Sequence, residues 1–516
     1  MTSNTETQNK RIAKNTIALY VRMAFSMAVG LYSSRVVLQV LGVTDFGLWN
    51  VVAGVVTMFQ FLNSSMSGCS SRFISYELGK GERGCPQKIF SVALTIHIII
   101  ALVIVLLCET VGLFFLLNKL VISENRLHAA FVVFQLSVVG SFFTVTQVPY
   151  NASIIANEKM NIFAYIELLN VFLRLAILFL LEALPGDHLI VYGELMLGIS
   201  IFIAFLYRVY CVRCLNYCKF KLSLEPKAVK AMLSFSLWDL YGNGAVMART
   251  QGVNMLLNMF FSAAMNAASA VATSVQNATM ALAANVVSAF RPQIVKCCAC
   301  KDYKRMTTLI NNAAIYTTIL LLLFSIPLWV EMDFVLKLWL KDPPEYASTF
   351  CRLILVFNLF ANLSSVVVAG VHATGKIKRT SFVNGTLYLL VIPFSYFVYM
   401  YGGGASAPYY FNIGAVCLGM IQNIFVLRKN VPFFSVVDYI KIVAKFIIMG
   451  TLLFVGLSAL GDYIKCSIIR FSVICCLNCV LLLVVSVVWI FDKSDQSMIK
   501  NKLTNMFRGR KWNRNV

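Results

Sequence analysis

The hydrophobic pattern of the chain consists of long apolar stretches separated by short polar breaks. Fourteen of these stretches reach the length that a helix needs to cross a bilayer, about 20 residues. Because the breaks are short, we expect an all-α polytopic membrane protein without a large soluble domain. The expected spans are residues 15–41, 45–71, 88–117, 126–150, 160–183, 188–213, 229–258, 263–290, 305–330, 348–373, 380–401, 406–427, 436–460 and 466–491.

Basic residues divide the breaks into two alternating sets. One set is rich in Lys and Arg and includes both termini, from Lys10 and Arg11 to Arg510 and Lys511, whereas the other set holds few basic residues. By the positive-inside rule the basic set is cytoplasmic. Both termini are then cytoplasmic, which requires an even number of spans and agrees with fourteen.

Two pairs of positions indicate an internal repeat. Arg72 and Arg291 each stand near the end of a span and differ by 219 positions, while Lys159 and Lys376 differ by 217. The agreement predicts two parallel six-helix lobes, residues 1–225 and 226–430. Two additional helices at 431–495 and a basic cytoplasmic tail at 496–516 would follow. Repeated lobes of this kind commonly hold a substrate site between them and open alternately to each side.

A polar stripe runs along the expected eighth span. Its residues recur at steps of three, four or eight, so most fall near one face of a helix. An unsatisfied polar group in hydrocarbon costs several kcal/mol, by a rough estimate, so the stripe faces protein or a water-filled cavity. Simple packing of small residues between helices is the alternative. The stripe consists of Asn266, Ser269, Thr273, Asn277, Asn285, Ser288 and Arg291.

Arginines outnumber acids at membrane depth, which favours a cationic cavity. Guanidinium groups stay charged and bind phosphate through two parallel hydrogen bonds, so the cargo is expected to be anionic. The candidate substrate-binding residues are Arg22, Arg35, Arg72, Arg249 and Arg291 with the amides Asn243, Asn254 and Asn277. Arg35 has an alternative role, since it stands near a span end from which it can reach the interface.

Acids inside the spans are candidates for ion coupling. Asp239 shares the seventh span with Arg249, beside the polar eighth span, and this combination is the strongest site signal in the chain. Glu167, Asn170 and Arg174 fall on one face of the fifth span, where a structural buried ion pair is the alternative. The coupling candidates are therefore Asp239, Glu167 and Arg174. For the single histidines His97 and His372 we expect core or loop roles rather than proton relay.

Composition supports this interpretation and excludes others. The chain of 516 residues is 59% hydrophobic and 13% charged, with a mean hydropathy of +0.77, which excludes a soluble globular protein. The net charge of +22 follows from the basic loops, so nucleic acid is not an expected partner. The 15 scattered cysteines indicate neither a disulfide framework nor a metal site. The first apolar segment is too long for a signal peptide and is expected to remain uncleaved.

The N-terminal region resembles a known family. The segments Leu41–Trp49, Leu62–Asn63 and Ser71–Gly81 are similar to the start of Wzx-type polysaccharide flippases, which belong to the multidrug/oligosaccharidyl-lipid/polysaccharide (MOP) exporter superfamily. The LG-x-x-x-(F/Y)-G turn, here Leu41 to Gly47, is moderately specific. The resemblance is strongest over about residues 10–90 and extends weakly through 150–160 and over the hydropathy plan.

This resemblance implies a fold, a cargo and a location. It implies two six-helix lobes around a cavity lined by the first, second, seventh and eighth helices. The implied cargo is an undecaprenyl-pyrophosphate-linked oligosaccharide, flipped across the bacterial inner membrane for O-antigen lipopolysaccharide or capsule export. A proton or sodium gradient would drive the movement, and polysaccharide polymerase or assembly proteins would be partners. No cofactor is expected.

Other functions remain open from the sequence. A peptidoglycan-precursor flippase would also use arginines to bind an anionic cargo and would also have fourteen spans. A multidrug exporter of the MATE (multidrug and toxic compound extrusion) type would need a cavity rich in acids rather than arginines. A membrane glycan polymerase would be an enzyme with catalytic residues in large outer loops, but the longest outer loop, near Glu331 to Glu345, is short. We find no catalytic constellation and expect a protein that is not an enzyme.

Overall fold

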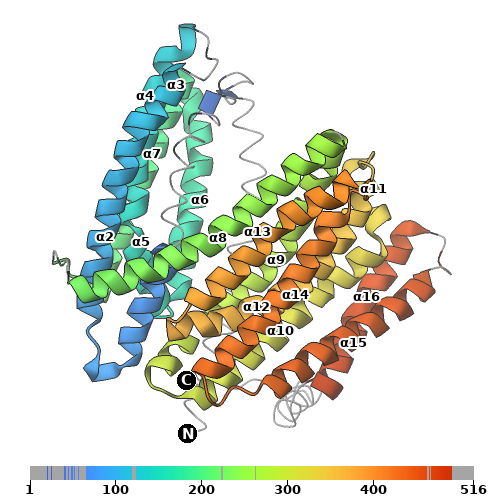
Figure 1. Cartoon of the computed structure of the whole chain (residues 1–516). Helices are drawn as coiled ribbons and strands as arrows, with labels where there is room; N and C mark the ends of the chain where they lie inside the picture. The colour runs from blue at the N-terminus through green and yellow to red at the C-terminus, as the bar shows by residue number, and fades with distance from the viewer. Residues whose placement is uncertain are drawn as a thin grey trace, which may run out of the picture. The chain divides into compact units, whose positions relative to one another are not determined.

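The structure is a computed structural model and is helical throughout the residues it describes. These are residues 66–490, except 119–121, 123, 222, 224, 262, 462–463 and 465, together with the isolated positions 20, 25, 40, 41, 45, 48, 49, 52 and 56. Within this part of the chain there is no β-strand. The expectation of an all-α polytopic membrane fold is confirmed (Figure 1).

In the first part of the chain, after the described segment 66–79, the helices are long and several follow one another with almost no break. Helix α2 (Pro86–Leu107) passes through a π-helical turn, η2 (Cys108–Gly112), into α3 (Leu113–Asn118). Helices α4 (Glu124–Thr146) and α5 (Val148–Ala156) are separated by a single residue. Helices α6 (Met160–Ala183) and α7 (His188–Cys214) complete this part, and α7 packs against both α4 and α6.

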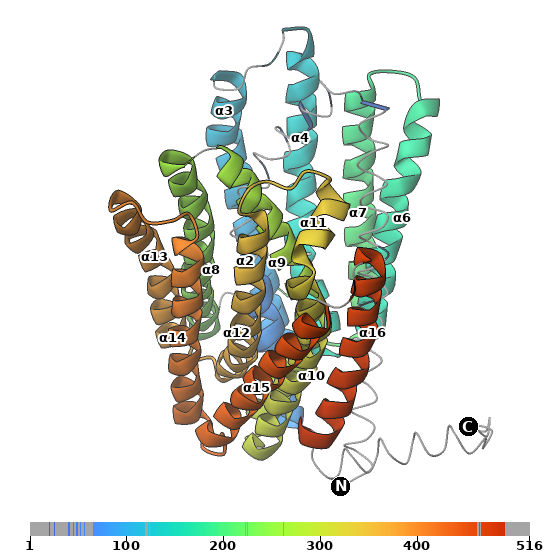
Figure 2. The same cartoon turned by 90° about the vertical axis from the view of Figure 1, so that its right-hand side faces the viewer.

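The middle of the chain contains the two longest helices, α8 (Pro226–Phe260) and α9 (Ala263–Ala299). At 1.5 Å per residue, each is about 50–55 Å long, well beyond the roughly 30 Å of a hydrocarbon core. They are followed by α10 (Tyr303–Val330), the short α11 (Met332–Leu340), α12 (Ala347–Thr374), α13 (Lys378–Met400) and α14 (Ala407–Asn430). The chain ends in α15 (Val436–Gly461) and α16 (Ser467–Val485), which are labelled in Figure 2.

Apolar length and polarity separate two kinds of helix. Ten of the described helical segments are long and apolar enough to cross a membrane, whereas α8 and α9 do not qualify despite their length. They fail because polar residues and small alanines lower their hydropathy. The two helices that carry the predicted polar positions are therefore the ones least suited to lipid on all sides.

The chain divides into two compact units. The first consists of residues 1–244, 288–306 and 369–385, and the second of residues 245–287, 307–368 and 386–516. The boundary between the units falls inside α8, α9, α10, α12 and α13, so the chain passes from one unit to the other within continuous helices. The predicted lobes at 1–225 and 226–430 and the separate C-terminal pair at 431–495 stay a prediction.

Each unit has its own hydrophobic core. In the first unit, α2, α5 and α7 surround a cluster that includes Phe90, Tyr150 and Tyr207. In the second unit, residues of α8, α9, α12 and α14 pack around Phe350 and Leu257. The helices that carry candidate site residues are thus fixed by apolar packing within their own unit.

Helix α16 is held against α10 and the residue that follows it by polar contacts. Pro327 lies inside α10 and has no N–H to offer the carbonyl of Leu323. Asn478 of α16 fills that vacancy, since its Nδ2 donates to the Leu323 carbonyl oxygen at 3.0 Å. Near the start of α16, Arg470 donates to both oxygens of the buried carboxylate of Glu331, the residue that follows α10, at 2.5 and 2.7 Å. These contacts specify where α16 docks.

Candidate functional site

Arg249 lies in α8, where it is buried, with 7% of its surface exposed. Its guanidinium carbon stands 4.8 Å from the centroid of the Tyr388 ring and 5.4 Å from that of Phe357. Both rings belong to the same unit as Arg249. The π faces stabilise the cation but do not satisfy its N–H groups.

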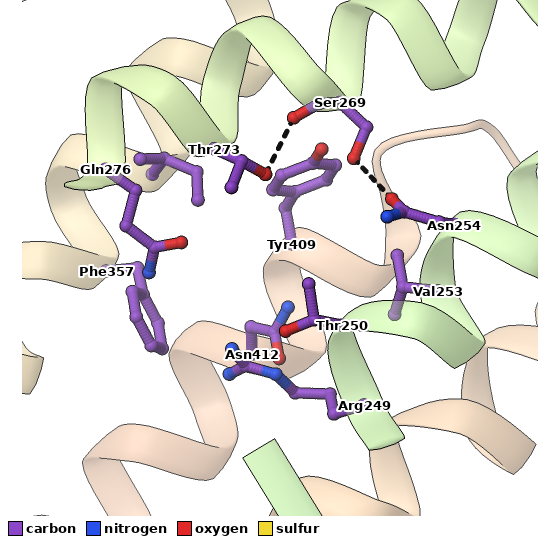
Figure 3. A pocket seen from close by; sticks show the side chains of 11 residues that line it. Arg249, Thr250, Val253, Asn254, Ser269, Thr273, Gln276, Phe357, Tyr409 and Asn412 are labelled. Atoms are coloured by element: carbon purple, nitrogen blue, oxygen red, sulfur yellow. Dashed lines mark hydrogen bonds between the residues drawn. The ribbon is translucent and has the colours of Figure 1, made fainter. Parts of the chain in front are cut away.

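A polar cavity opens beside Arg249 (Figure 3). It is lined by Arg249, Thr250, Val253, Asn254, Ser269, Thr273, Gln276, Ile354, Phe357, Tyr409 and Asn412, all within the second unit. Its volume is about 40 Å³ for the centres of water-sized spheres. A single buried water needs roughly 10–15 Å³ by the same measure, so the cavity holds a few waters or a small anionic group.

Two buried polar atoms of residues that line this cavity have no hydrogen-bond partner among the described residues. They are Nη1 of Arg249, a donor, and Oδ1 of Asn412, an acceptor. On the opposite side of the view in Figure 3, Ser269 donates to Asn254 Oδ1 at 2.9 Å and Thr273 donates to the Ser269 carbonyl at 2.9 Å. Among the described residues, no acid forms an ion pair with Arg249. Within the described part of the chain, the positive charge of Arg249 is therefore not balanced by an ion pair.

Arg72, in the first unit, is buried in a different arrangement. Its Nη2 donates to the carbonyl of Ala373 at 3.1 Å, and its guanidinium lies within 4.5–5.8 Å of the rings of Phe73, Tyr76 and Phe235. Gly375 has a φ of +77°, and a Cβ at this position would lie 2.5 Å from Arg72 Nη2. The guanidinium is thus held by backbone and rings, which makes Arg72 a poorer ligand site than Arg249.

Arg291, Asp239 and His372 form a charged cluster in the first unit. His372 Nε2 lies 4.0 Å from Asp239 Oδ1, Asn243 donates to Asp239 Oδ2 at 3.1 Å, and Arg291 interacts electrostatically with both Asp239 and His372. The sequence analysis gave Asn243 and Arg291 as substrate-binding candidates and Asp239 as a coupling candidate, and it expected a core or loop role for His372. Arg291 was expected to end its span, whereas α9 continues through Pro292 to Ala299, so this arginine lies inside the helix.

A second polar contact, which the sequence analysis did not identify as a site, joins α5 to α9. The buried Glu158 accepts hydrogen bonds from Lys296 Nζ at 2.6 Å and from Gln293 Nε2 at 3.1 Å. Cys300 Sγ also donates to the Gly79 carbonyl at 2.6 Å, close to the same end of α9. The sequence offered no signal for this pair, because Glu158 and Lys296 stand near the ends of expected spans, where charge is usually solvated.

The remaining candidates are distributed differently. Glu167 accepts from Tyr207 at 2.8 Å, while Arg174 donates to Asn170 at 3.1 Å, so Glu167 and Arg174 share a helix without pairing. Asn277 lies on an exposed face of α9, and Thr273 and Gln276 line the cavity instead. Arg22 and Arg35 lie outside the described residues.

Metal binding finds no support in the described part of the chain. No group of three or more His, Cys, Asp or Glu residues there is placed to hold an ion. The site is therefore built from cations, amides, hydroxyls and aromatic rings.

Comparison with known proteins gives a match over part of the chain. Residues 245–397 match the MatE family model, which covers less than a third of the chain and includes Arg249, Tyr388 and Phe357. A search of curated proteins finds no significant match. The MatE segment also contains α9 and its polar residues.

Solved structures with the same fold cover most of the chain. An outward-facing multidrug-resistance MATE transporter of the MOP superfamily aligns with a TM-score of 0.70 at 13% identity, over 83% of this chain and 97% of the other. A MATE structure in the straight conformation gives 0.68 at 13% identity, over 82% and 96%. A MOP superfamily transporter from Pyrococcus furiosus, described as having a binding pocket of reversed polarity that suggests a different function, gives 0.68 at 13% identity, over 81% and 96%. The chain therefore has the fold of the MATE transporters of the MOP superfamily, and its segment 245–397 is similar in sequence to the MatE family.

Proposed function

We propose that the protein is a flippase that moves an undecaprenyl-pyrophosphate-linked oligosaccharide across the bacterial inner membrane by alternating access. The observation that carries this proposal is the buried guanidinium of Arg249, which has no acidic partner among the described residues and lines a polar cavity. The MOP superfamily fold and the resemblance of residues 41–81 to polysaccharide flippases support it.

The chemistry of the cavity suits an anionic headgroup. A buried charge left without a partner costs several kcal/mol, as an order of magnitude, and an entering phosphate oxygen removes this cost. The amides and hydroxyls of Asn254, Ser269, Thr273 and Gln276 can donate hydrogen bonds to phosphate oxygens or to water. Since the cavity holds only a few waters, it would serve as the contact for one phosphate group, while the sugars lie outside it.

No covalent step is required of the protein. The polyprenyl tail stays in lipid while the headgroup passes through the protein. The drive is a proton or sodium gradient, for which Asp239 is the better coupling candidate than Glu167. Asp239 has the Arg291 guanidinium and the His372 ring as neighbours, whereas Glu167 is engaged by the buried Tyr207.

A MATE-type drug exporter is the second candidate, because the MatE family model matches residues 245–397. An exporter of cationic drugs needs acids in its binding site, but the cavity beside Arg249 is lined by a cation and neutral polar groups. The Pyrococcus furiosus transporter, described as having a pocket of reversed polarity, is a precedent within the fold for a change in pocket charge accompanied by a different function.

The test is export of surface glycan by Arg249 variants in the native host. We expect Arg249→Ala to abolish glycan export. Arg249→Lys should retain at most a small fraction of it, because lysine keeps the charge but lacks the planar guanidinium group that binds phosphate through two hydrogen bonds. Arg213→Ala, at an exposed position near the end of α7, is the control for loss of a positive charge. Normal surface glycan in a correctly inserted Arg249→Ala variant would refute the proposed site. If that variant kept its surface glycan and lost resistance to cationic drugs, the result would support the drug exporter.

A further inference from the structure

The first unit contains the ends of three helices from the second half of the chain. Residues 226–244 at the start of α8, 288–306 around the end of α9 and 369–385 around the end of α12 cluster with residues 1–225. The sequence repeat predicts instead that all three segments belong to a second lobe, 226–430. They hold or adjoin basic breaks of the sequence, so this is the end of the bundle that we expect to face the cytoplasm. Contacts at this end therefore tie the two predicted lobes together.

The buried carboxylate of Glu158, in the turn after α5, makes one of these contacts. It accepts hydrogen bonds from Lys296 Nζ at 2.6 Å and from Gln293 Nε2 at 3.1 Å, both on α9. The Lys296 side chain is 28% exposed, so water reaches the contact from the lysine side. Charged groups of this kind are well solvated when they separate, which makes the contact reversible in a way that apolar packing is not.

Gly79 brings a second helical segment, 66–79, against the same part of α9. A Cβ on Gly79 would lie 2.8 Å from both the Ala299 Cβ and the Lys296 Cα. No side chain fits at this distance, so the two backbones meet directly. Cys300 Sγ donates to the Gly79 carbonyl at 2.6 Å at the same place. The end of α9 is therefore held by both the segment 66–79 and the turn after α5.

Arg72 extends these contacts to the end of α12. It shares one face of the segment 66–79 with Ser75 and Gly79, at positions i, i+3 and i+7, and its Nη2 donates to the Ala373 carbonyl at 3.1 Å. Arg72 Nε, Ser75 Oγ and Gln293 Oε1 are buried and have no hydrogen-bond partner among the described residues. Water would satisfy such groups if the helices parted, so the packed arrangement carries a cost that the parted one does not.

We propose that these contacts form a gate at the basic end of the bundle, closed in this structure, in which Glu158, Gly79 and Arg72 hold the ends of α9 and α12 against the first half of the chain. The gate serves the alternating access of the proposed function, on which this assignment rests. It identifies the residues that must separate before cargo can enter from this side. Its polar contacts can break and form again in every transport cycle.

Two buried cysteines of the chain report whether the gate is open. Cys298, on α9, is 8% exposed and faces the Arg72 guanidinium closely enough to interact with it electrostatically. Cys69, on the segment 66–79, is fully buried, and its Sγ donates to the Met232 carbonyl of α8 at 3.5 Å. Both thiols should react with a maleimide only after α8 and α9 have moved away from the segment 66–79.

The labelling is measured on the full-length protein in lipid nanodiscs, where both faces are accessible to a water-soluble maleimide. Mass spectrometry of the peptides gives the rate for each cysteine. Cys300 is exposed and serves as the reference for reagent access. Cys351 is buried in the core of the second unit and reports unfolding of the protein.

A wedge at Gly79 is the first test. In Gly79→Val the new side chain cannot fit against Ala299, so we expect the gate to open and the labelling rates of Cys69 and Cys298 to rise about tenfold or more. Gly68, on the same helical segment, has no atom within 4 Å of its Cβ position, which makes Gly68→Val the matched control. The control should label at the rate of the wild type.

Removal of the charged contact is the second test, and it introduces no steric clash. In the double variant Glu158→Gln with Lys296→Met the side chains keep a similar length and leave no buried charge. We expect labelling of Cys69 and Cys298 to rise about tenfold, as for the loss of one charged hydrogen bond. The control is Lys88→Met with Glu225→Gln, which removes an exposed ion pair of 2.8 Å in the same unit.

Three results would overturn the gate. The first is equal labelling of the gate variants and their controls. The second is faster labelling of Cys298 alone, which would show a local opening of α9. The third is a parallel rise at Cys351, which would show that the contacts hold the fold together rather than close a pathway. None of these measurements needs the cargo, so normal glycan export by Arg249→Ala would reject the proposed function and leave the gate, whereas unchanged labelling would reject the gate alone.

Discussion

The Arg249 guanidinium carbon lies 4.8 Å from the centroid of the Tyr388 ring, and these two residues are 139 positions apart in the chain. The contact joins α8 to α13 within the second unit and holds the cation over a π face instead of an acid. Such an arrangement keeps the charge available to a ligand at the expense of stability.

Replacing Arg249 with methionine should therefore make the protein more stable while removing its function. Methionine has a similar length and fits between the two rings without a charge that needs solvation. We expect the midpoint of thermal unfolding in detergent to rise, by the equivalent of about 1 kcal/mol or more. Surface glycan should be absent at the same time. A clear fall in the unfolding midpoint would show that Arg249 has a structural role instead.

Asp239 should couple cargo movement to an ion gradient. In Asp239→Asn the Arg291 and His372 neighbours lose their acid, and we expect transport in proteoliposomes to become insensitive to an imposed proton gradient. Glu167→Gln, in which the amide oxygen still accepts from Tyr207, is the control and should retain the response. Unchanged gradient dependence in Asp239→Asn, or loss of a sodium response in its place, would show that Asp239 does not bind the coupling proton.

The Glu158–Lys296 contact should behave as a coupled pair. Lys296→Met leaves a buried carboxylate with a neutral partner, Gln293, and we expect a loss of about 2–4 kcal/mol in stability. Adding Glu158→Gln to this variant removes the buried negative charge and should restore much of the loss. Thermal unfolding of the two single variants and the double variant closes the cycle. Additive effects would mean that the two residues do not interact.

Gly375→Ala should destabilise the protein more than Gly402→Ala. Both glycines have a φ of +77°, so both variants bear the same backbone strain, about 1 kcal/mol. At Gly375 the new methyl group would also push Arg72 away from the Ala373 carbonyl, whereas Gly402 has no atom within 4 Å of its Cβ position. We expect an additional loss of about 1–2 kcal/mol for the broken hydrogen bond. Equal unfolding midpoints would show that this hydrogen bond contributes nothing.

Asp187 should make the start of α7 sensitive to acid. Burial alone would raise the pKa of its carboxyl group, but hydrogen bonds from Arg126 and from the N–H groups of Leu189 and Ile190 outweigh it and hold the pKa below its usual range. The stabilisation is thus present above about pH 4, the unfolded value, and is lost as the pH falls through the lower folded value.

The size of this effect is modest because the Asp187–Arg126 contact is partly exposed. We expect Asp187→Asn to lower stability at neutral pH by at most about 1 kcal/mol, the contribution of a partly exposed ion pair, because asparagine still caps the helix. The difference in stability between the variant and the wild type should shrink as the pH falls through the lowered folded-state pKa of Asp187. Unfolding midpoints measured from pH 3 to pH 7 check this, with the exposed Asp342→Asn as control. A constant difference over that range would contradict the assignment.

The positions of the helices could be read from the sequence because apolar runs of spanning length have few alternatives. The expected span 160–183 coincides with α6, and most other boundaries agree within a few residues. Deviations occur where helices extend beyond the hydrocarbon core. Helix α9 continues to Ala299, and the break after α10 contains the amphipathic helix α11. Hydropathy reports the length inside the membrane, not the length of the helix.

The candidate site was predictable in part, since an arginine inside an apolar run stands out from its neighbours. Arg249 and Asp239 were identified in this way. The aromatic partners of Arg249 were not identified, because Tyr388 and Phe357 are two among many aromatic residues and nothing local distinguishes them. The same applies to Glu158 and Lys296, which look like ordinary charged residues of cytoplasmic turns until tertiary packing buries the carboxylate.

The low apolarity of α8 and α9 has a consequence for how the chain is made. During synthesis each helix leaves the translocation channel for lipid only if its own sequence favours that step, and these two are the least hydrophobic of the long described helices. These two helices would have to remain at the translocation channel until α10 and α12 have been synthesised and pack over their amides and charges. A nascent chain stopped shortly after Ala299 should therefore remain at the translocon or be degraded, whereas one extended past Thr374 should leave it as a paired and protected bundle.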